Sequence, residues 1–137
     1  MDTTEFGEQI VALLQDEVGD HLRSVIGYTS ETYTIHYIRK DVEDAYSEEN
    51  LDQVLEELRL ETLEKEYLNT IFQEMHGDFE YRLDMFGDAV EMNFVVADGE
   101  GLEVAIDRAY FAQEDRLANS VLELVERYQG EESSSSG

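Results

Sequence analysis

Two stretches of alternating apolar and polar residues constrain this chain more than any other feature. The apolar positions of the first are Phe79, Tyr81, Leu83 and Met85, and those of the second are Val90, Met92, Phe94 and Val96. A two-residue turn at Gly87-Asp88 would pair Met85 with Val90 and Leu83 with Met92, so that both apolar sets share one face. The pattern therefore predicts an antiparallel hairpin.

A third strand is expected after the loop at residues 97–101. We predict that Leu102 pairs with Val96, Val104 with Phe94 and Ile106 with Met92. The opposite face of the three strands carries Glu80, Arg82, Asp84, Glu91, Asn93 and Glu103. We expect that face to be solvated or lightly covered, with Asp84 directly opposite Glu91.

The N-terminal half predicts one helix and a second hairpin. Apolar residues recur at helical spacing over residues 6–18, and Gly19 follows as a stop. Residues 21–28 and 33–40 are rich in tyrosine and β-branched residues, which is typical of strands. The expected pairs are Tyr28 with Tyr33, Ile26 with Ile35, and Ser24 with Tyr37.

Two further helical regions are expected. Ser47 is a candidate N-cap for residues 47–75, but one straight helix of that length would measure about 43 Å. We therefore predict a break at residues 59–62. Asp107 is the candidate cap of a final helix that includes Phe111 and ends at Gly130. Residues 1–130 are expected to form one domain, and residues 131–137 a disordered polar tail.

The element order helix, two strands, broken helix, three strands, helix predicts an α+β domain with a five-stranded antiparallel sheet packed by helices. Over residues 6–128 this order is similar to that of the roadblock and profilin-like domains. The resemblance implies an interaction or regulatory module that dimerises by helix or strand pairing and has no catalytic motif.

The charge of the chain excludes several classes of function. Asp and Glu number 34 against 9 Lys and Arg, for a net charge of −25, and cysteine is absent. There is no basic stripe for nucleic acid or anionic lipid, no apolar run long enough for a membrane span, and no thiolate site.

Acidic residues occur on nearly every polar face, which indicates a protein adapted to molar salt. At about 1 M ionic strength the Debye length is roughly 3 Å, so surface carboxylates hardly repel one another and would be neutralised by solvent cations. We infer a cytoplasmic protein of a halophile; the rival interpretation is an acidic surface for a basic partner. The segments GDHLRSVIGY, YTIHYIRKDV, LEELRLETLEKEYL, HGDFEYRL and DAVEMNF resemble a family of small uncharacterised domain proteins of halophilic archaea. That resemblance implies no activity.

No motif for catalysis or for a cofactor is found in the sequence. A phosphate-binding loop and the spacings typical of zinc or calcium ligands are absent. His76, Asp78 and Glu80 are the one cluster of metal-ligand residue types, but carboxylates are so abundant in this chain that their proximity is a weak signal. We therefore expect neither a cofactor nor a metal. Arg39 and Lys40, the only adjacent cations, are interpreted as partners of nearby carboxylates and not as an anion site.

The remaining candidates for a ligand site or an interface are Tyr28, Tyr33, Tyr37 and His36. Packing in the core is the simpler role for these residues. The favoured function is a non-enzymatic regulatory or interaction module that binds a protein partner or forms a homodimer. The alternative is a small-molecule sensor with an aromatic pocket. An enzyme that uses carboxylates with His36 or His76 is a third possibility.

Overall fold

The computed structural model describes residues 3–111 and 116–135 of the chain. Its elements in chain order are α1 (Thr3–Val18), η1 (Gly19–His21), β1 (Leu22–Tyr28), β2 (Tyr33–Ile38), α2 (Lys40–Ala45), α3 (Glu48–Thr62), α4 (Glu64–His76), β3 (Arg82–Met85), β4 (Ala89–Ala97), β5 (Glu100–Asp107), η2 (Arg108–Phe111) and α5 (Arg116–Ser135). None of the helices within those ranges is long and apolar enough to cross a bilayer.

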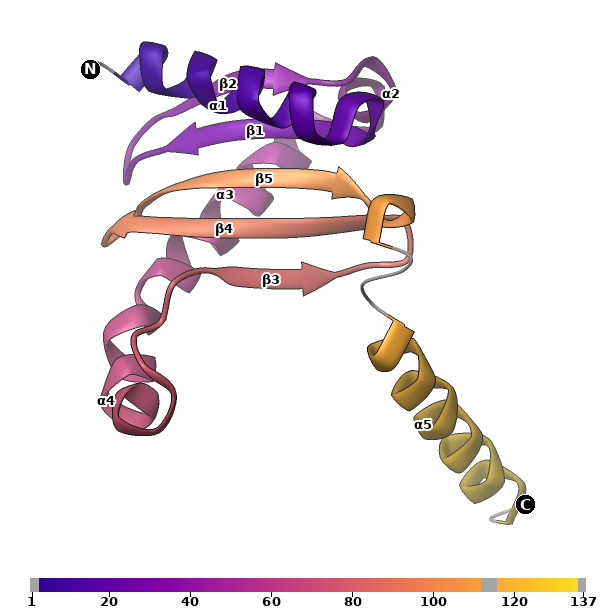
Figure 1. Ribbon diagram of the computed structural model, residues 1–137. Helices are drawn as coiled ribbons and strands as arrows, with labels where there is room; N and C mark the ends of the chain where they lie inside the picture. The colour runs from indigo at the N-terminus through magenta and orange to yellow at the C-terminus, as the bar shows by residue number, and fades with distance from the viewer. Residues whose placement is uncertain (1–2, 112–115, 136–137) are drawn as a thin grey trace.

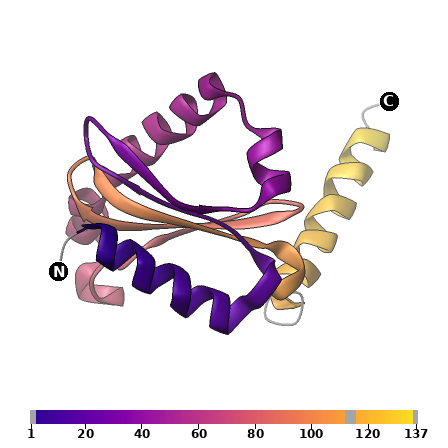
Figure 2. The same ribbon diagram turned by 90° about the horizontal axis from the view of Figure 1, so that it is seen from above.

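The five strands form one open antiparallel sheet in the order β2-β1-β5-β4-β3. Helix α1 lies over one face at the β1–β2 side, and α3 crosses the other face (Figures 1 and 2). The α+β fold class, the strand count and the element order predicted from the sequence are confirmed. One short helix, α2, was not predicted: β2 ends at Ile38, and residue 40 begins this helix instead of ending the strand.

The hairpin of β3 and β4 has the predicted register. Met85 pairs with Val90, Leu83 with Met92, and Asp84 lies opposite Glu91. Tyr81 precedes the strand, and its ring stacks on that of Phe94 with 4.9 Å between centroids. The alternation of apolar residues was sufficient to place this hairpin.

The register of β4 and β5 differs from the prediction by two residues. Leu102 pairs with Phe94 and Val104 with Met92. The connection is shorter than the expected five-residue loop, because β4 continues to Ala97 and β5 begins at Glu100. Gly99 makes this tight turn possible with φ of 75°, and the ladder is irregular between Val95 and Ala97.

The observed register of β1 and β2 differs from the predicted one because of a bulge. The pairs Tyr28–Tyr33 and Ile26–Ile35 are confirmed, but Tyr37 pairs with Val25 and not with Ser24. One residue of β2, His36, is therefore extra between the two ladder positions. A bulge of this kind inserts a residue into one strand only, which a simple alternation of residues does not reveal.

The middle helical region is broken, as predicted, although one residue beyond the expected range. Helix α3 ends at Thr62, and α4 begins at Glu64 with Leu63 between them. Ser47 caps α3: its Oγ accepts a hydrogen bond from the Asn50 backbone N–H at 3.1 Å. The Asn50 side chain accepts in return from the Ser47 N–H, which completes a capping box.

The predicted boundaries of the final helix are wrong. Asp107 is the last residue of β5 and caps no helix, and Phe111 belongs to η2. Helix α5 continues through Gly130 to Ser135. The single domain over residues 1–130 stays a prediction, and the last two residues of the predicted tail lie outside the described ranges.

The core consists of two layers, one on each side of the sheet. On the α1 side, Ile10, Val11 and Leu14 pack on a buried cluster that comprises Val18, Leu22, Val25, Leu102, Val104 and Ile106. On the α3 side, Leu55 and Leu58 pack on Ile26 and Tyr28. Full burial of each such aliphatic side chain stabilises the fold by about 1.5–3 kcal/mol.

Candidate functional site

The four residues predicted as a ligand or interface site lie on two faces of the sheet. Tyr28 packs with Leu55 and Leu58 on the α3 side, and Tyr33 pairs with it across the ladder. Tyr37 packs instead on the α1-side core. Simple alternation along residues 33–40 would place Tyr33 and Tyr37 on one face opposite His36, but the bulge at His36 shifts the alternation by one residue and puts the two tyrosines on opposite faces.

His36 is wedged between two glycines. A Cβ atom at Gly7 of α1 would overlap the His36 ring, and one at Gly27 of β1 would lie 2.9 Å from His36 Nε2. The side chain therefore holds α1 close to the sheet and is not set in a cleft. A glycine inside a predicted helix was the sequence signal for this close approach.

A hollow of about 580 Å³ lies at the end of the sheet where β1 ends and β5 begins. Phe6 at the start of α1, Tyr28, Tyr33, Val96 and Leu102 line it, together with threonines of the β1–β2 turn. Its volume is within the range of small-molecule sites. The structure thus brings two of the four predicted residues to one hollow.

Tyr28 belongs to a buried polar network beneath α3. Its hydroxyl donates to Asn93 Oδ1. The Asn93 amide donates to the Leu58 carbonyl at 3.3 Å and to Glu61 Oε2 at 2.9 Å. Burial raises the pKa of Tyr28 to about 12, so the phenol remains a donor at neutral pH.

Glu103 lies beside this network and is 1% exposed. Its Oε2 has no hydrogen-bond partner within the described residues. Burial, with the nearby carboxylates of Glu91 and Glu61, raises the pKa of Glu103 to about 8, and burial also raises the pKa of Glu91 and of Glu61. Around Asn93 and Glu103 the polar sheet face is therefore buried under α3 and not solvated, whereas Glu80 is exposed and Arg82 and Asp84 are partly exposed. With this pKa, Glu103 is largely protonated at pH 7.

Metal ligation has no support in this arrangement. Among the side chains that the structure describes, no three from His, Cys, Asp or Glu are placed to hold one ion. In the weak cluster predicted at the end of α4, His76 stacks on Phe72 with 5.7 Å between centroids, and Asp78 accepts a hydrogen bond from Gln73 at 2.5 Å.

The adjacent cations Arg39 and Lys40 pair with carboxylates, as predicted. Arg39 donates to both oxygens of Asp107, at 2.8 and 2.9 Å, and also to Asp41. Lys40 Nζ lies 3.0 Å from Asp44 Oδ1. Hydrogen bonds from Arg39, with a further one from Arg23, hold the pKa of Asp107 at about 2. This cluster joins the ends of three strands and presents no free cation for an anionic ligand.

A further functional candidate is the apolar face of the β3–β4 hairpin, whose residues the alternation predicts on one side of the sheet. We call it the open sheet face, formed by Tyr81, Leu83, Met85, Met92 and Phe94. Leu83 is 41% and Met85 40% exposed, and no helix crosses in front of β3 and β4 (Figure 1). Exposed apolar areas of this kind mark interaction sites on folded proteins.

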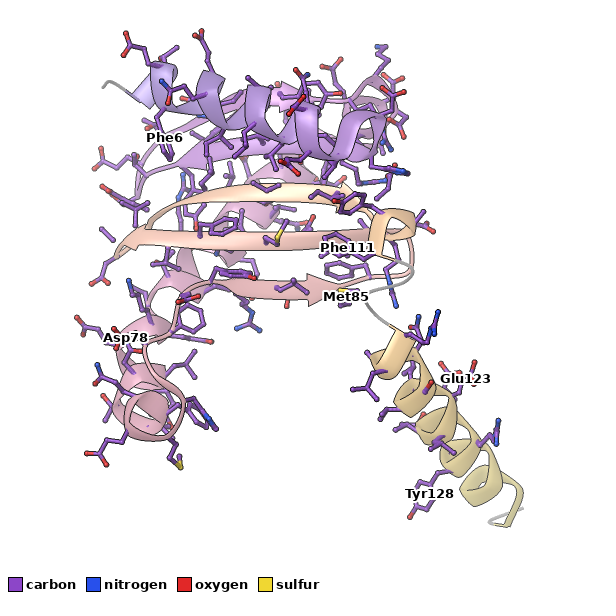
Figure 3. All side chains as sticks on the ribbon, viewed as in Figure 1. Phe6, Asp78, Met85, Phe111, Glu123 and Tyr128 are labelled. Carbon is purple, nitrogen blue, oxygen red and sulfur yellow. The ribbon has the colours of Figure 1, made fainter. Side chains whose placement is uncertain are left out.

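Two helices that flank the edge strand β3 also expose apolar stripes. The α5 stripe consists of Leu117, Val121, Leu124, Val125 and Tyr128, and the α4 stripe of Tyr67, Ile71, Phe72 and Met75; all of these residues are exposed. Glu123 and Tyr128 project from opposite sides of α5 (Figure 3), so the helix is amphipathic with its apolar side unpacked. The sequence predicted a final helix here but not its separation from the sheet.

A comparison with family models identifies the chain's family. The model of a domain of unknown function, DUF7522, matches residues 8–126, and the chain belongs to that family. No curated protein and no solved structure matches the chain.

Proposed function

We propose that this DUF7522 protein is a non-enzymatic interaction module of a halophilic archaeon that works in the cytoplasm. The observation that carries the proposal is the open sheet face, where Leu83 and Met85 stay exposed in a chain of net charge −25. This chain is rich in acidic residues, whereas this exposed face is apolar. Association with a partner would remove it from water.

Salt adaptation is supported by where the acids lie. Asp84 and Glu91 face each other across a ladder, an arrangement that costs a few tenths of a kcal/mol or more in dilute buffer. Molar salt screens most of that repulsion while it strengthens apolar contacts. An apolar contact through the open sheet face is therefore expected to be stable at the molar salt concentration of a halophile's cytoplasm. The layered arrangement of α1, sheet and α3 supports the proposed likeness to roadblock and profilin-like domains.

The test compares three proteins in molar KCl by sizing and by cross-linking in a lysate of the source organism. We expect the wild type to associate with itself or with a protein partner, and L83S/M85S to lose that association. L13S is the matched control, because Leu13 is a similarly exposed leucine on α1. A wild type that remains a strict monomer without a cross-linked partner overturns the proposal.

The hollow at Tyr28 and Tyr33 favours one second candidate, a sensor of a small neutral aromatic molecule. Apolar side chains and threonine hydroxyls are the lining expected for such a ligand. The test is a titration with indole followed by amide chemical shifts in molar KCl. Saturable shifts at Thr34 and Leu102 that T34W abolishes support the sensor, whereas an unchanged spectrum contradicts it.

A further inference from the structure

The side of the sheet on which α1 lies is only half covered, and the open sheet face is its uncovered half. Four strand spacings give a sheet about 19 Å wide, whereas one packed helix covers a strip about 10 Å wide. Helix α1 covers β1 and β2 and reaches β5 through Ile10, Val11 and Leu14. A second helix with an apolar side would be required to cover β4 and β3.

Helix α5 has the properties of that missing helix. Its stripe repeats at i, i+4, i+7 and i+11 from Leu117 to Tyr128 and spans about 18 Å. The nine residues of β4 extend over about 30 Å, so the stripe fits along the strand. Both surfaces are apolar and exposed: Leu83 and Met85 on the sheet, and the whole α5 stripe on the helix.

In the observed position, α5 does not cover its own sheet. Arg108 donates to the Phe86 carbonyl at 2.8 Å and to Asn119 Oδ1 at 2.8 Å. These bonds tie the first turns of α5 to the β3–β4 turn, and the helix runs from there away from the body (Figures 1 and 2). Helix α5 is continuous from Arg116 to Ser135, so in this position its later turns lie away from β4.

The charge of α5 favours a second copy of the same chain as the occupant. Residues 116–128 contain two arginines and two glutamates, so this segment is neutral in a strongly acidic protein. This segment therefore adds no net repulsion of its own when it approaches another acidic copy. In a two-fold symmetric dimer the same contact forms twice, so the buried area is double that of one contact. A stable interface buries roughly 1,200–2,000 Å² in total.

We propose that two copies exchange α5, each laying its α5 stripe on the open sheet face of the other. This inference rests on the proposed interaction function and names its partner. The absence of cysteine from the chain allows a direct test with introduced thiols. L83C places a thiol on the open sheet face, and V121C places one on the α5 stripe.

In the first experiment, L83C and V121C proteins are mixed, equilibrated in molar KCl and joined with a short bismaleimide linker. Exchange predicts a covalent dimer in the mixture that neither variant gives alone to the same extent. E8C mixed with V121C is the matched control, because Glu8 is exposed on α1, and it is expected to stay unlinked.

In the second experiment, the double variant L83C/V121C carries both thiols on one chain. Exchange predicts linked species of twice the monomer mass, whereas linked monomers would show that α5 folds back on its own sheet and would overturn the proposal. V121E/L124E is expected to shift the dimer to monomer in sedimentation without loss of sheet signal, and E123Q to leave it dimeric.

The two proposals fail differently. If L83S/M85S abolishes association but L83C and V121C do not link across chains, the interaction module stands and the exchange of α5 is wrong. If the wild type has no partner of any kind, both are wrong.

Discussion

Glu103 is a carboxyl group enclosed between the sheet and α3. Because its folded pKa is about 8 against an ordinary value of 4.5, the folded protein retains a proton that the unfolded chain has released between these pH values. The contribution of Glu103 to the free energy of unfolding is therefore fully present below about pH 4.5 and is lost as the pH rises through 8.

Replacement of Glu103 by glutamine tests this directly. We expect the free energy of unfolding of the wild type to fall between pH 5 and 8, with at most about 1.4 kcal/mol per pH unit from this one group. E103Q is expected to show a shallower fall, because the amide keeps the shape without the titration. Denaturation at each pH measures it, and E56Q on the exposed side of α3 is the control. Equal slopes for wild type and E103Q would contradict the assignment.

Gly7 offers a second test at the level of one residue. Alanine favours helix over glycine, yet G7A is expected to destabilise the fold by about 1–3 kcal/mol, because its Cβ would overlap the His36 ring. H36A in the same chain should recover part of the loss. G130A, where a Cβ meets nothing within 4 Å, should be neutral or stabilising in the same thermal denaturation. A stable G7A protein would show that α1 can move away from the sheet at no cost.

Among the elements, the sheet ends are joined by Asp107 at the end of β5. Its carboxylate accepts from Arg39, which follows β2, and from Arg23 of β1. Asp107 resembles a helix cap in the sequence, because it lies just before a helical pattern and that proximity is a local signal. Its real partners are far away in sequence, and only the strand order brings them together.

D107N is expected to lower the free energy of unfolding by about 2 kcal/mol or more at pH 7, because two arginines lose a charged acceptor. The folded pKa of about 2 lies below the ordinary 3.8, so this stabilisation is present above about pH 4 and is lost as the pH falls toward 2. Urea denaturation at pH 7 and pH 2.5 should show the difference shrink. D41N, which removes a more exposed partner of Arg39, is expected to have the smaller effect. A constant difference at both pH values would argue against ion pairing.

At the same scale, periodicity predicted most elements but not how they meet. The β3–β4 register followed from alternation alone, whereas the β4–β5 register depended on where β4 stops. The bulge at His36 was equally hidden, and it separated Tyr37 from Tyr28 and Tyr33. The candidate site was therefore predicted only in part, because only two of its four residues line one hollow. The exposure of the apolar face of β3 and β4 was not predicted, because nothing in the sequence shows where α5 is placed.

For the whole molecule, the charge of −25 predicts a strong dependence on salt. We expect the melting temperature to rise from dilute buffer to molar KCl, because screening removes repulsion among surface carboxylates. Sucrose, which strengthens apolar burial without ions, is the control and should raise the melting temperature less. Equal stability in dilute buffer and in molar KCl would contradict the halophilic assignment.

The strand order also sets when the fold can be completed during synthesis. The β1–β2 hairpin leaves the ribosome early, but the strand that pairs with the other edge of β1 is β5. Val25 can therefore pair with Val104 only after β5 has been synthesised. Until then the nascent chain holds its first hairpin without its neighbour, with the edge of β1 unpaired. The three-stranded meander of β3, β4 and β5, made from contiguous sequence, is the part to which that hairpin finally docks.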